Sequence, residues 1–421
     1  MIIKNPYNIV VPAYLDNEFF TTALEEGLRE AKINITEINF EWGSNPGDNY
    51  CSCIYRVVVL YERLSGEYNQ KEQLNLIVKS IPITKETQFL EDVGVFIKEK
   101  IIYTDILPRL EILGQDFKFG ANCYYTIKSP TQTIVFDDLQ VDGFKLAARQ
   151  DGLDWHHSLL LLQQLGKFHA TSMVLARKDP NIVKRLKNGM LCEDTIIKSN
   201  TYKHIFGSTL LQLISYVKNW QGYLNITERL AYYYDHFNEI TLKSSETKPD
   251  DRYVVLNHGD LWTTNFMFAY DDPTVPKIPT RALFIDFQLS IYASPAMDIN
   301  FFLNTSVQLE VLQKYRDDLI YEYYRTFSET LMRLHFPNIP TFEDLQHELR
   351  SRELYGLFGL YGFYPMISIP KEASGDSSIE TWSDETFKRK KFDASFSSEK
   401  VQAFLKWNLK RMEALGVFND F

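Results

Sequence analysis

The chain has 421 residues and a formal net charge of −10. This acidity argues against general binding to nucleic acids or anionic membranes, because both are polyanions. Hydrophobic residues make up 45% of the sequence, enough for one large two-lobed domain or for two or three separate domains. The N-terminal segment lacks the apolar core of a signal peptide, and no run reaches transmembrane length. We therefore expect a cytoplasmic protein without membrane insertion.

The N-terminal part of the chain has the alternation of a small sheet preceded by a helix. Apolar residues recur at helical spacing over 16–31 and alternate in the segments that follow. The predicted strands cover 33–42, 53–61 and 74–79. Residues 43–50 form a turn-rich loop between the first two strands, and Asn49 within it and Ser52 just after it are candidate phosphate donors.

The third predicted strand ends on Lys79, and a helix is expected to follow over about 85–107. A lysine at a strand end usually seeks the surface, and charged helix positions are often simply exposed. In a kinase arrangement, such a lysine contacts phosphates and pairs with a glutamate on the next helix. Glu91 and Glu99 are the candidates for that partner.

Two more strands are predicted at 123–127 and 133–136, and the second runs into Asp137-Asp138-Leu139. Beyond this point the pattern becomes helical. Within it, a lone His169 is expected to be structural, and the aromatic residues of 355–364 are expected to be core. Residues 367–398 mix Pro, Gly, Ser and charges and predict a mobile loop. The predicted helices are 155–177, 205–230, 308–335, 341–362 and 399–414.

The strongest motif runs from His258 through Asp260 to Asn265, with Asp286 a further 21 residues on. Phosphoryl transfer from a metal–nucleotide complex needs such a set. One carboxylate, Asp260, orients and deprotonates a hydroxyl group, while an amide and a second carboxylate, Asn265 and Asp286, hold Mg²⁺. Magnesium takes hard oxygen ligands and only one or two protein carboxylates, which fits this pair.

The string His258-Gly259-Asp260-Leu261-Trp262…Asn265, followed by Ile285-Asp286-Phe287-Gln288 and Ser294-Pro295-Ala296-Met297-Asp298, resembles the CHK kinase-like family of arthropods, which includes the ecdysteroid kinases. More broadly it resembles the aminoglycoside and choline kinase branch of the protein-kinase-like fold. The segment Phe96 to Pro108 also resembles the family's F-x-x-E-x-x-x-Y-x-x-x-L-P, which favours Glu99 over Glu91 as the partner of Lys79.

The resemblance implies an α+β fold with two lobes. Residues 1–138 would form a nucleotide-binding lobe, and residues 139–421 a mostly helical lobe with the catalytic loop and the acceptor cleft. Asp137, Asp138 and Leu139 would be the hinge whose backbone reads adenine, although the family usually has Glu at the first position. Asp298 would brace the catalytic loop, or else be a local feature of a helix start.

The implied activity is transfer of phosphate from ATP, with Mg²⁺, to a hydroxyl group of an ecdysteroid or a similar lipophilic alcohol. Alternatives are a detoxifying kinase of xenobiotic alcohols or phenols and a catalytically silent binding protein. A protein kinase is disfavoured, because Asp298 follows Asp286 by only 12 positions, too few for a regulatory activation loop. No nucleic-acid or protein partner is indicated.

Overall fold

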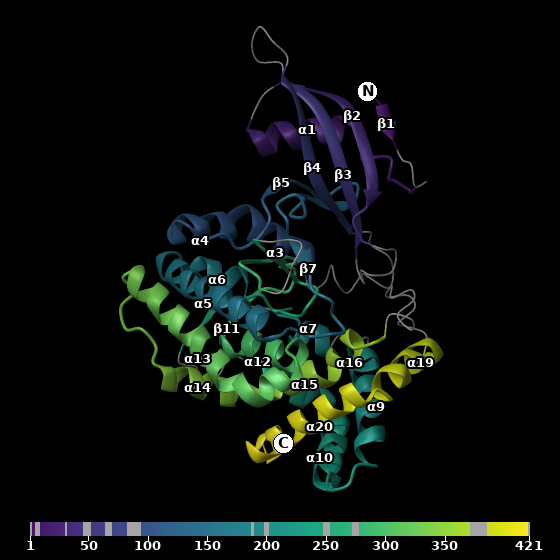
Figure 1. Ribbon diagram of the computed structural model, residues 1–421, viewed down its shortest axis with the longest axis vertical. Coiled ribbons are helices and arrows are strands. Elements are labelled where there is room, and N and C mark those ends of the chain that lie inside the picture. The colour runs from purple at the N-terminus through teal and green to yellow at the C-terminus, as the bar shows by residue number, and fades with distance from the viewer. Residues whose placement is uncertain are drawn as a thin grey trace.

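The computed structural model describes residues 2–4, 9–29, 32–44, 52–63, 70–81, 94–186, 189–197, 202–246, 253–271, 278–370 and 385–419. A sheet-bearing part is stacked on a larger helical part along the long axis of the molecule (Figure 1). The predicted α+β class with two lobes is confirmed. The boundary between residues 138 and 139 stays a prediction, and Asn49 and Glu91 lie outside the described residues.

The sheet-bearing part contains six strands in the order β1-β2-β3-β4-β6-β5. Neighbouring strands are antiparallel except β1 and β2, which are parallel. The bounds predicted for β2 and β5 are confirmed, whereas β3, β4 and β6 are longer than predicted. The bounds are β1 Ile2–Lys4, β2 Ile33–Trp42, β3 Cys53–Arg63, β4 Gln70–Ile81, β5 Cys123–Ile127 and β6 Gln132–Asp137.

One face of this sheet is covered by α1, Asn17–Leu28. The helix starts where the sequence predicts, because the Asp16 carboxylate accepts a hydrogen bond from the backbone N–H of Phe19 at 3.0 Å. Phe20 and Leu24 of α1 belong to one buried core with residues of β2, β3 and β4.

The opposite face of the sheet packs against the helices that follow β4. Successive side chains of a strand point to opposite faces. Val78 therefore lies in the core under α1, whereas Ile81 lies in the second core, which extends into the helical part. Lys79 alternates with Val78, so its side chain points away from α1 and towards α3, Val95–Ile101. Strand alternation thus places the lysine opposite the helix that carries Glu99.

The helix predicted over about 85–107 ends later than expected, at Gly114, and is less regular; its first part, up to residue 93, lies outside the described residues. Its described part begins at α3, continues through the π-helical turn η1, Ile102–Ile106, and ends with α4, Leu107–Gly114. Pro108 does not end it, because proline is tolerated in the first turn of a helical segment.

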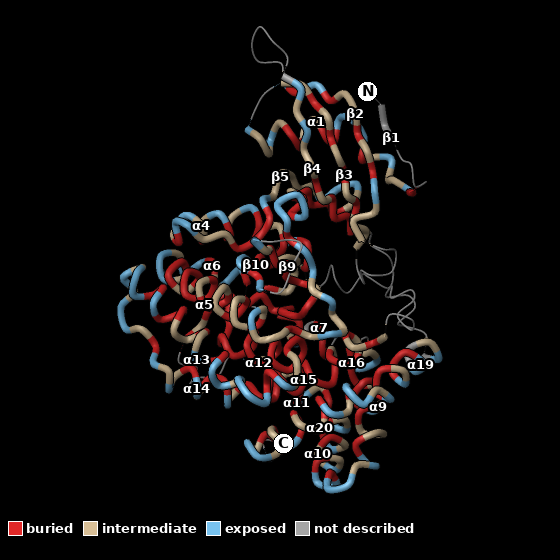
Figure 2. Tube along the Cα trace, viewed as in Figure 1, coloured by how far each residue is buried: buried red, intermediate tan, exposed pale blue. Residues whose placement is uncertain are grey.

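The helical part is built around one large hydrophobic core. In Figure 2, much of the trace in this part is coloured as buried. Its short strands form two small sheets, β10-β9-β7 and β11-β8. The strands are β7 Lys145–Leu146, β8 Val255–Asn257, β9 Phe266–Ala269, β10 Arg281–Phe284 and β11 Ile291–Ala293. The helices are α5 Trp155–Lys178, α6 Asn181–Arg185, α7 Glu193–Ile196, η2 Lys203–Gly207, α9 Ser208–Val217, α10 Leu224–Asp235, α11 Phe237–Ser245, α12 Ala296–Thr305, α13 Leu309–Arg333, α14 Phe342–Ser351, α15 Glu353–Gly362, α16 Tyr364–Ile367, α19 Glu385–Phe396, α20 Glu399–Ala414 and η3 Val417–Asn419.

Three helical predictions need correction. The segment 205–230 is two helices, α9 and α10, separated by a turn in which Gly222 has a φ of 81°. The segment 341–362 is divided at Arg352 into α14 and α15. Residues 385–396, predicted as loop, form α19, while 371–384 lie outside the described residues. Within the described ranges, every helix is too short or too polar to cross a bilayer.

Candidate active site

The catalytic-loop motif lies between β8 and β9, in the middle of the helical part. Pairing of β8 with β11 and of β9 with β10 fixes both ends of the loop. Gly259 has a φ of 82°, and a Cβ atom there would collide with the carbonyl oxygen of Leu289. Only glycine fits both the left-handed conformation and the close approach. The Gly of His-Gly-Asp is therefore required by local geometry.

Asp298 braces this loop from the first turn of α12. Its Oδ2 accepts a hydrogen bond from the backbone N–H of His258 at 2.6 Å, and its Oδ1 accepts one from Gly259 at 2.9 Å. His169 contacts the same carboxylate at 3.2 Å and the hydroxyl of Tyr323 at 2.8 Å. The structural expectation for His169 and the bracing expectation for Asp298 are confirmed.

Asp260 and Asn265 close the loop on each other. The Nδ2 group of Asn265 donates to the backbone carbonyl of Asp260 and to its Oδ2 atom, both at 2.8 Å. Oδ1 of Asp260 is buried, and no described residue makes a hydrogen bond of normal geometry to it. Burial, and second the negative charge of Asp286, raise the pKa of Asp260 to about 7. A carboxyl group with that pKa can exchange a proton near neutral pH.

Asp286 follows β10 and lies beside the catalytic loop. The N–H of Ile285 donates to the carbonyl of Asn265 at 2.9 Å, and the carbonyl of Ile285 accepts from Nε2 of His258 at 2.9 Å. Asp286 has a φ of 66°, an uncommon conformation for a residue with a side chain. Such conformations cost free energy and are retained mostly at functional sites.

Lys79 joins the sheet to this loop through two ion pairs. Its Nζ atom lies 2.7 Å from a carboxylate oxygen of Glu99 and 2.7 Å from Oδ1 of Asp286. Burial alone would lower the pKa of Lys79, but the carboxylates of Asp286 and Glu99 outweigh it and raise the pKa. The lysine is therefore charged, and the five residues Lys79, Glu99, Asp260, Asn265 and Asp286 form one cluster. Their roles stay predictions.

Two oxygen atoms in this cluster are suited to a magnesium ion. Asn265 uses its NH₂ group on Asp260, which leaves Oδ1 with only a long contact of 3.4 Å from the hydroxyl of Thr264. Oδ2 of Asp286 has only a 3.3 Å contact from Gln288, and the Asp286 side chain is 29% exposed. One amide and one carboxylate oxygen, both weakly engaged, fit a cation that keeps its other positions for water and phosphate.

The predicted hinge lies where β6 leaves the sheet. The backbone N–H of Asp137 donates to Asn122, and that of Asp138 donates to Asn75, both at 3.1 Å. Among the described residues, no backbone carbonyl accepts a hydrogen bond from the N–H of Leu139. The Asp138 carboxylate pairs with Arg56 of β3 at 2.6 Å. Ser52, the last candidate, lies just before β3 and is half-buried.

Arg56 and Trp262 are the residues that the sequence reasoning undervalued. Arg56 ties β3 to the hinge, and the only signal for it is a charged side chain within an apolar strand. Trp262 carries a buried indole N–H for which the described part of the chain offers no hydrogen-bond partner of normal geometry. By contrast, the aromatic residues of 355–364 were predicted as core, and all but the half-buried Phe363 are buried.

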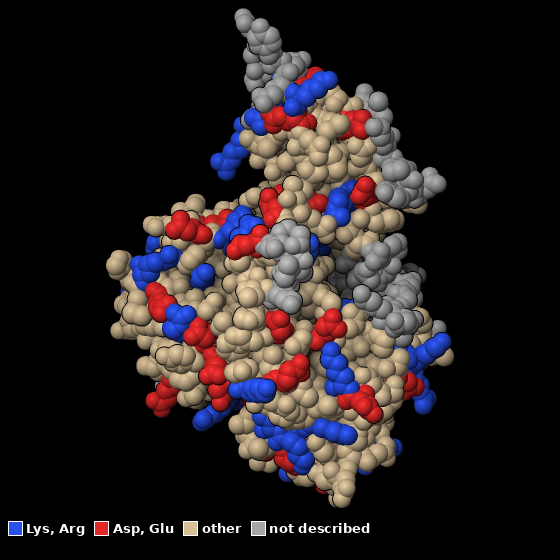
Figure 3. Space-filling model, viewed as in Figure 1, with Lys and Arg blue, Asp and Glu red and all other residues tan. Residues whose placement is uncertain are grey.

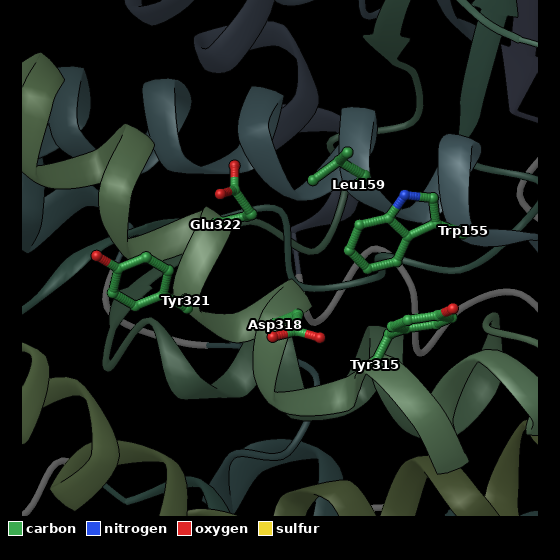
Figure 4. Close-up of a pocket in the computed structure, with 6 residues that line it drawn as sticks. All are labelled: Trp155, Leu159, Tyr315, Asp318, Tyr321 and Glu322. Carbon is green, nitrogen blue, oxygen red and sulfur yellow. The ribbon is translucent and has the colours of Figure 1, made fainter.

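A cavity of about 440 Å³ lies elsewhere, between α5 and α13 (Figure 4). None of the predicted site residues lines it. It is lined by Trp155, Leu159, Tyr315, Asp318, Tyr321 and Glu322. Over the face drawn in Figure 3, basic and acidic side chains are interspersed. The candidate active site is therefore defined by the charged cluster and not by this cavity.

A family model described as the ecdysteroid kinase-like family matches residues 46–336, more than half of the chain. The chain belongs to the ecdysteroid kinase-like family. The match includes Lys79, Glu99, the hinge, the catalytic loop and Asp286. No curated protein matches the chain significantly.

Solved structures of small-molecule kinases are distantly similar to this family member. A choline kinase from Cryptosporidium parvum has 10% identity and a TM-score of 0.49, covering 96% of this chain and 98% of that chain. A Plasmodium vivax ethanolamine kinase has 13% identity and a TM-score of 0.38, covering 87% and 83%. A microcompartment-associated aminopropanol kinase has 12% identity and a TM-score of 0.38, covering 95% and 99%. With TM-scores this low, the assignment rests on the family match and on the geometry.

Proposed function

We propose that this protein is an ATP- and Mg²⁺-dependent kinase that phosphorylates a hydroxyl group of a small molecule. The observation that carries the proposal is the position of Lys79, whose Nζ atom is 2.7 Å from both Glu99 and Asp286. This contact brings the sheet of the first lobe to the catalytic loop of the second. Membership in the ecdysteroid kinase-like family supports the same reaction class.

Each residue of the cluster has a separate task in this proposal. Lys79, oriented by Glu99, binds the phosphates of ATP, and the backbone N–H of Leu139 binds the adenine ring. Asp137 and Asp138 shape the hinge, and Ser52 and Asn49 are the proposed donors of the phosphate loop. Asn265 and Asp286 would hold Mg²⁺, which when bound neutralises the charge of the phosphates.

Asp260 acts on the acceptor. Its carboxylate orients the acceptor hydroxyl and takes its proton, while the hydroxyl oxygen forms a bond to the γ-phosphorus and the bond from that phosphorus to ADP breaks. The products are ADP and a phosphate monoester. Because the transition state is loose, positioning and charge neutralisation supply most of the rate enhancement. The pKa of about 7 makes Asp260 suitable as a base near neutral pH.

For the acceptor we propose an ecdysteroid or a similar lipophilic alcohol, on the strength of the family. The test is transfer of labelled γ-phosphate to a panel of an ecdysteroid, a simple phenol, choline and a generic protein. Wild type, Asp260→Asn and Asp286→Ala are compared. We expect label on the steroid with wild type alone, and Asp286→Ala should abolish Mg-nucleotide turnover.

The other outcomes separate the alternatives. Label on the phenol alone would support the proposed reaction but indicate that the protein is a detoxifying kinase. Label on the protein alone would indicate a protein kinase. Wild-type turnover retained in Asp286→Ala would contradict the metal assignment. No transfer and no binding of Mg-ATP would identify a silent binding protein.

A further inference from the structure

Lys79 shares its face of the sheet with a second cationic side chain, that of Arg56. In the register of β3 and β4, Lys79 pairs with Ile54. Arg56, two positions further along β3, pairs with Ile77 of β4. Residues directly opposite each other on antiparallel strands point to the same face, and diagonal neighbours on that face are about 7–8 Å apart. Arg56 is therefore a diagonal neighbour of Lys79, on the face that is turned away from α1.

The Arg56 side chain crosses this face to reach the predicted hinge. Its Nε atom donates to Oδ2 of Asp138 at 2.6 Å. Asp138 directly follows β6, and β4 lies between β3 and β6 in the sheet. Neighbouring strands are about 4.8 Å apart, so the arginine and the carboxylate together span roughly two strand spacings. The guanidinium therefore lies along the sheet, over β4 and next to the hinge.

One edge of the guanidinium is anchored, and the other edge is unused. Asp138 is 6% exposed, and its Oδ1 atom accepts a hydrogen bond from the backbone N–H of Gln140 at 3.1 Å. Arginine often binds a carboxylate through two parallel hydrogen bonds. Here only Nε donates, and no described residue accepts a hydrogen bond from either terminal NH₂ group of Arg56. The Arg56 side chain is 23% exposed, so its outer edge is accessible to a ligand.

The position of this edge indicates which part of a nucleotide it meets. In the proposed function, Lys79 binds the phosphates, and the backbone of the hinge binds the base. Arg56 is bonded to the hinge, so its guanidinium lies at the end of the site where the base is bound. A guanidinium is planar and weakly hydrated, and it stacks on the faces of aromatic rings.

We propose that the guanidinium of Arg56 stacks on the base of the bound nucleotide, and that Asp138 holds its plane in position. This inference rests on the proposed function, which places ATP between Lys79 and the hinge. It gives Arg56 a direct role in nucleotide binding besides its contact between β3 and the hinge. Because every nucleic-acid base has an aromatic face, the contact strengthens binding without selecting adenine.

The expected effect is confined to ligands that carry a base. Arg56→Lys keeps a cation for Asp138 but lacks the planar group, and Arg56→Met lacks both. We expect the dissociation constant of Mg-ATP to rise roughly fivefold in Arg56→Lys and roughly tenfold in Arg56→Met. Mg-tripolyphosphate has the phosphates without the base, so its dissociation constant should change less than about twofold. The matched control is Arg63→Lys, because Arg63 lies on the opposite face of β3 and pairs with Glu72 at 2.7 Å.

The first test is calorimetric titration of wild type and the three variants with both ligands, after urea unfolding has shown that each variant is folded. If Arg56→Met does not fold, Arg56→Lys decides the result. Equal losses for Mg-ATP and Mg-tripolyphosphate would make Arg56 a phosphate contact and overturn the inference. Wild-type affinity for Mg-ATP in Arg56→Lys would also overturn it, because the ion pair with Asp138 would then be sufficient.

The second test does not depend on turnover. The Nε–H group of Arg56, held by its hydrogen bond, gives a signal in a ¹⁵N–¹H spectrum that is lost in Arg56→Lys. An aromatic ring stacked on the guanidinium moves this signal to lower frequency through its ring current. We expect Mg-ATP to cause this shift and Mg-tripolyphosphate to cause none.

The outcomes separate this inference from the proposed function. An unshifted signal at saturating Mg-ATP would overturn the inference even if the enzyme is active. A shifted signal in a protein that transfers no phosphate would retain the stacking contact and reject the proposed function. A wild-type protein that binds no Mg-ATP would reject both.

Discussion

The two sides of the candidate active site are held in place by different means. On the side of the base, His258 and Gly259 are fixed through their backbone N–H groups by one buried carboxylate, Asp298, which is 1% exposed. On the side of the phosphates, Lys79 and Asp286 are held by an ion pair between side chains, and the Asp286 side chain is 29% exposed. The side of the base is fixed by the fold, whereas Lys79 and Asp286 on the other side can exchange each other for new partners.

This difference indicates how the site is prepared for its substrates. Hydrogen bonds from backbone N–H groups to a buried carboxylate are short and strong, and they leave the loop one geometry. A lysine ammonium is a compact charge on a flexible stem, so it can move from Asp286 to a phosphate when Mg-ATP binds. Under the proposed function, the base is therefore preformed, and the nucleotide completes the phosphate side.

The largest expected effect comes from Asp260→Asn, which tests whether the preformed side is catalytic. Loss of a general base lowers rates by about 10²- to 10⁴-fold, and we expect transfer to fall in that range. The binding of Mg-ATP should be retained, because the lysine and Asp286 remain. The measurements are labelled phosphate transfer and nucleotide titration. Transfer within threefold of wild type would show that Asp260 is not the base.

The same variant should gain stability relative to wild type as pH rises towards 7. The pKa of Asp260 is raised from 3.8 to about 7 by burial and, second, by Asp286, so the folded state binds an extra proton between those values. Wild type must therefore lose stability relative to Asp260→Asn as pH rises from about 4 to 7. Urea unfolding at pH 4.5, 6 and 8 measures the difference. A pH-independent difference would contradict the raised pKa.

The next effect concerns the fixed geometry of the catalytic loop. Gly259 and Gly143 have nearly the same φ, 82° and 83°, but an added Cβ meets the carbonyl of Leu289 at Gly259 and no atom within 4 Å at Gly143. Gly143→Ala should cost only the left-handed conformation, about 1–2 kcal/mol. Gly259→Ala should cost about 1–3 kcal/mol more, because the clash is with backbone.

Urea unfolding of both variants at one pH gives this comparison directly. Equal losses for Gly259→Ala and Gly143→Ala would mean that the loop can relax around the added methyl group. The base side would then be less firmly fixed than the hydrogen bonds to Asp298 indicate.

On the phosphate side, Glu99→Gln should weaken the site for nucleotide without unfolding it. The variant leaves Lys79 paired with Asp286, so the lysine is expected to resist transfer to a phosphate. We expect the KM for Mg-ATP to rise roughly tenfold, about 1.4 kcal/mol. Glu413→Gln, which removes the charge from a surface pair with Lys410 at 2.8 Å, is the matched control. Equal KM values in wild type, Glu99→Gln and Glu413→Gln would show that Glu99 does not contribute to nucleotide binding.

Local patterns in the sequence predicted much of this arrangement. The strand predicted to end on Lys79, followed by a helix with Glu99, anticipated the ion pair of these two residues, and the spacing of Asp260, Asn265 and Asp286 matched their final cluster. Both are short-range regularities: a strand has a period of two, and a loop of fixed length places its ends. The end predicted for the helix over about 85–107 was less accurate. The packing of η1 and α4, rather than the local sequence, decides where this helical segment ends.

The contacts that depend on distant parts of the chain were not predictable in the same way. Arg56 meets Asp138 across 82 positions, and nothing in the sequence near either residue indicates the pair. α19 has weak periodicity and was predicted as loop, but in the structure it packs against α9, α16 and α20. Tertiary packing overrides propensity in such segments. Whether the indole N–H of Trp262 finds a partner among the described residues likewise depends on which atoms surround it.

The smallest expected effect comes from Gln288→Ala, and it tests how loosely the phosphate side is held. Nε2 of Gln288 donates to Oδ2 of Asp286 at 3.3 Å, a long bond to one of the oxygens proposed to bind Mg²⁺. Removing it should change the unfolding free energy by less than about 1 kcal/mol. Because the amide competes with the cation for that oxygen, the Mg²⁺ concentration for half-maximal activity should fall about twofold, equal to ~0.4 kcal/mol.

The matched control is Gln163→Ala, which removes a similar bond, 3.1 Å to Glu322, on the surface of α5 and α13. It should leave the Mg²⁺ dependence unchanged. A loss of activity of tenfold or more in Gln288→Ala alone would mean that the glutamine holds Asp286 in its left-handed conformation. The phosphate side would then be braced in the same manner as the base side, and binding of Mg-ATP would require less rearrangement than the ion pair with Lys79 implies.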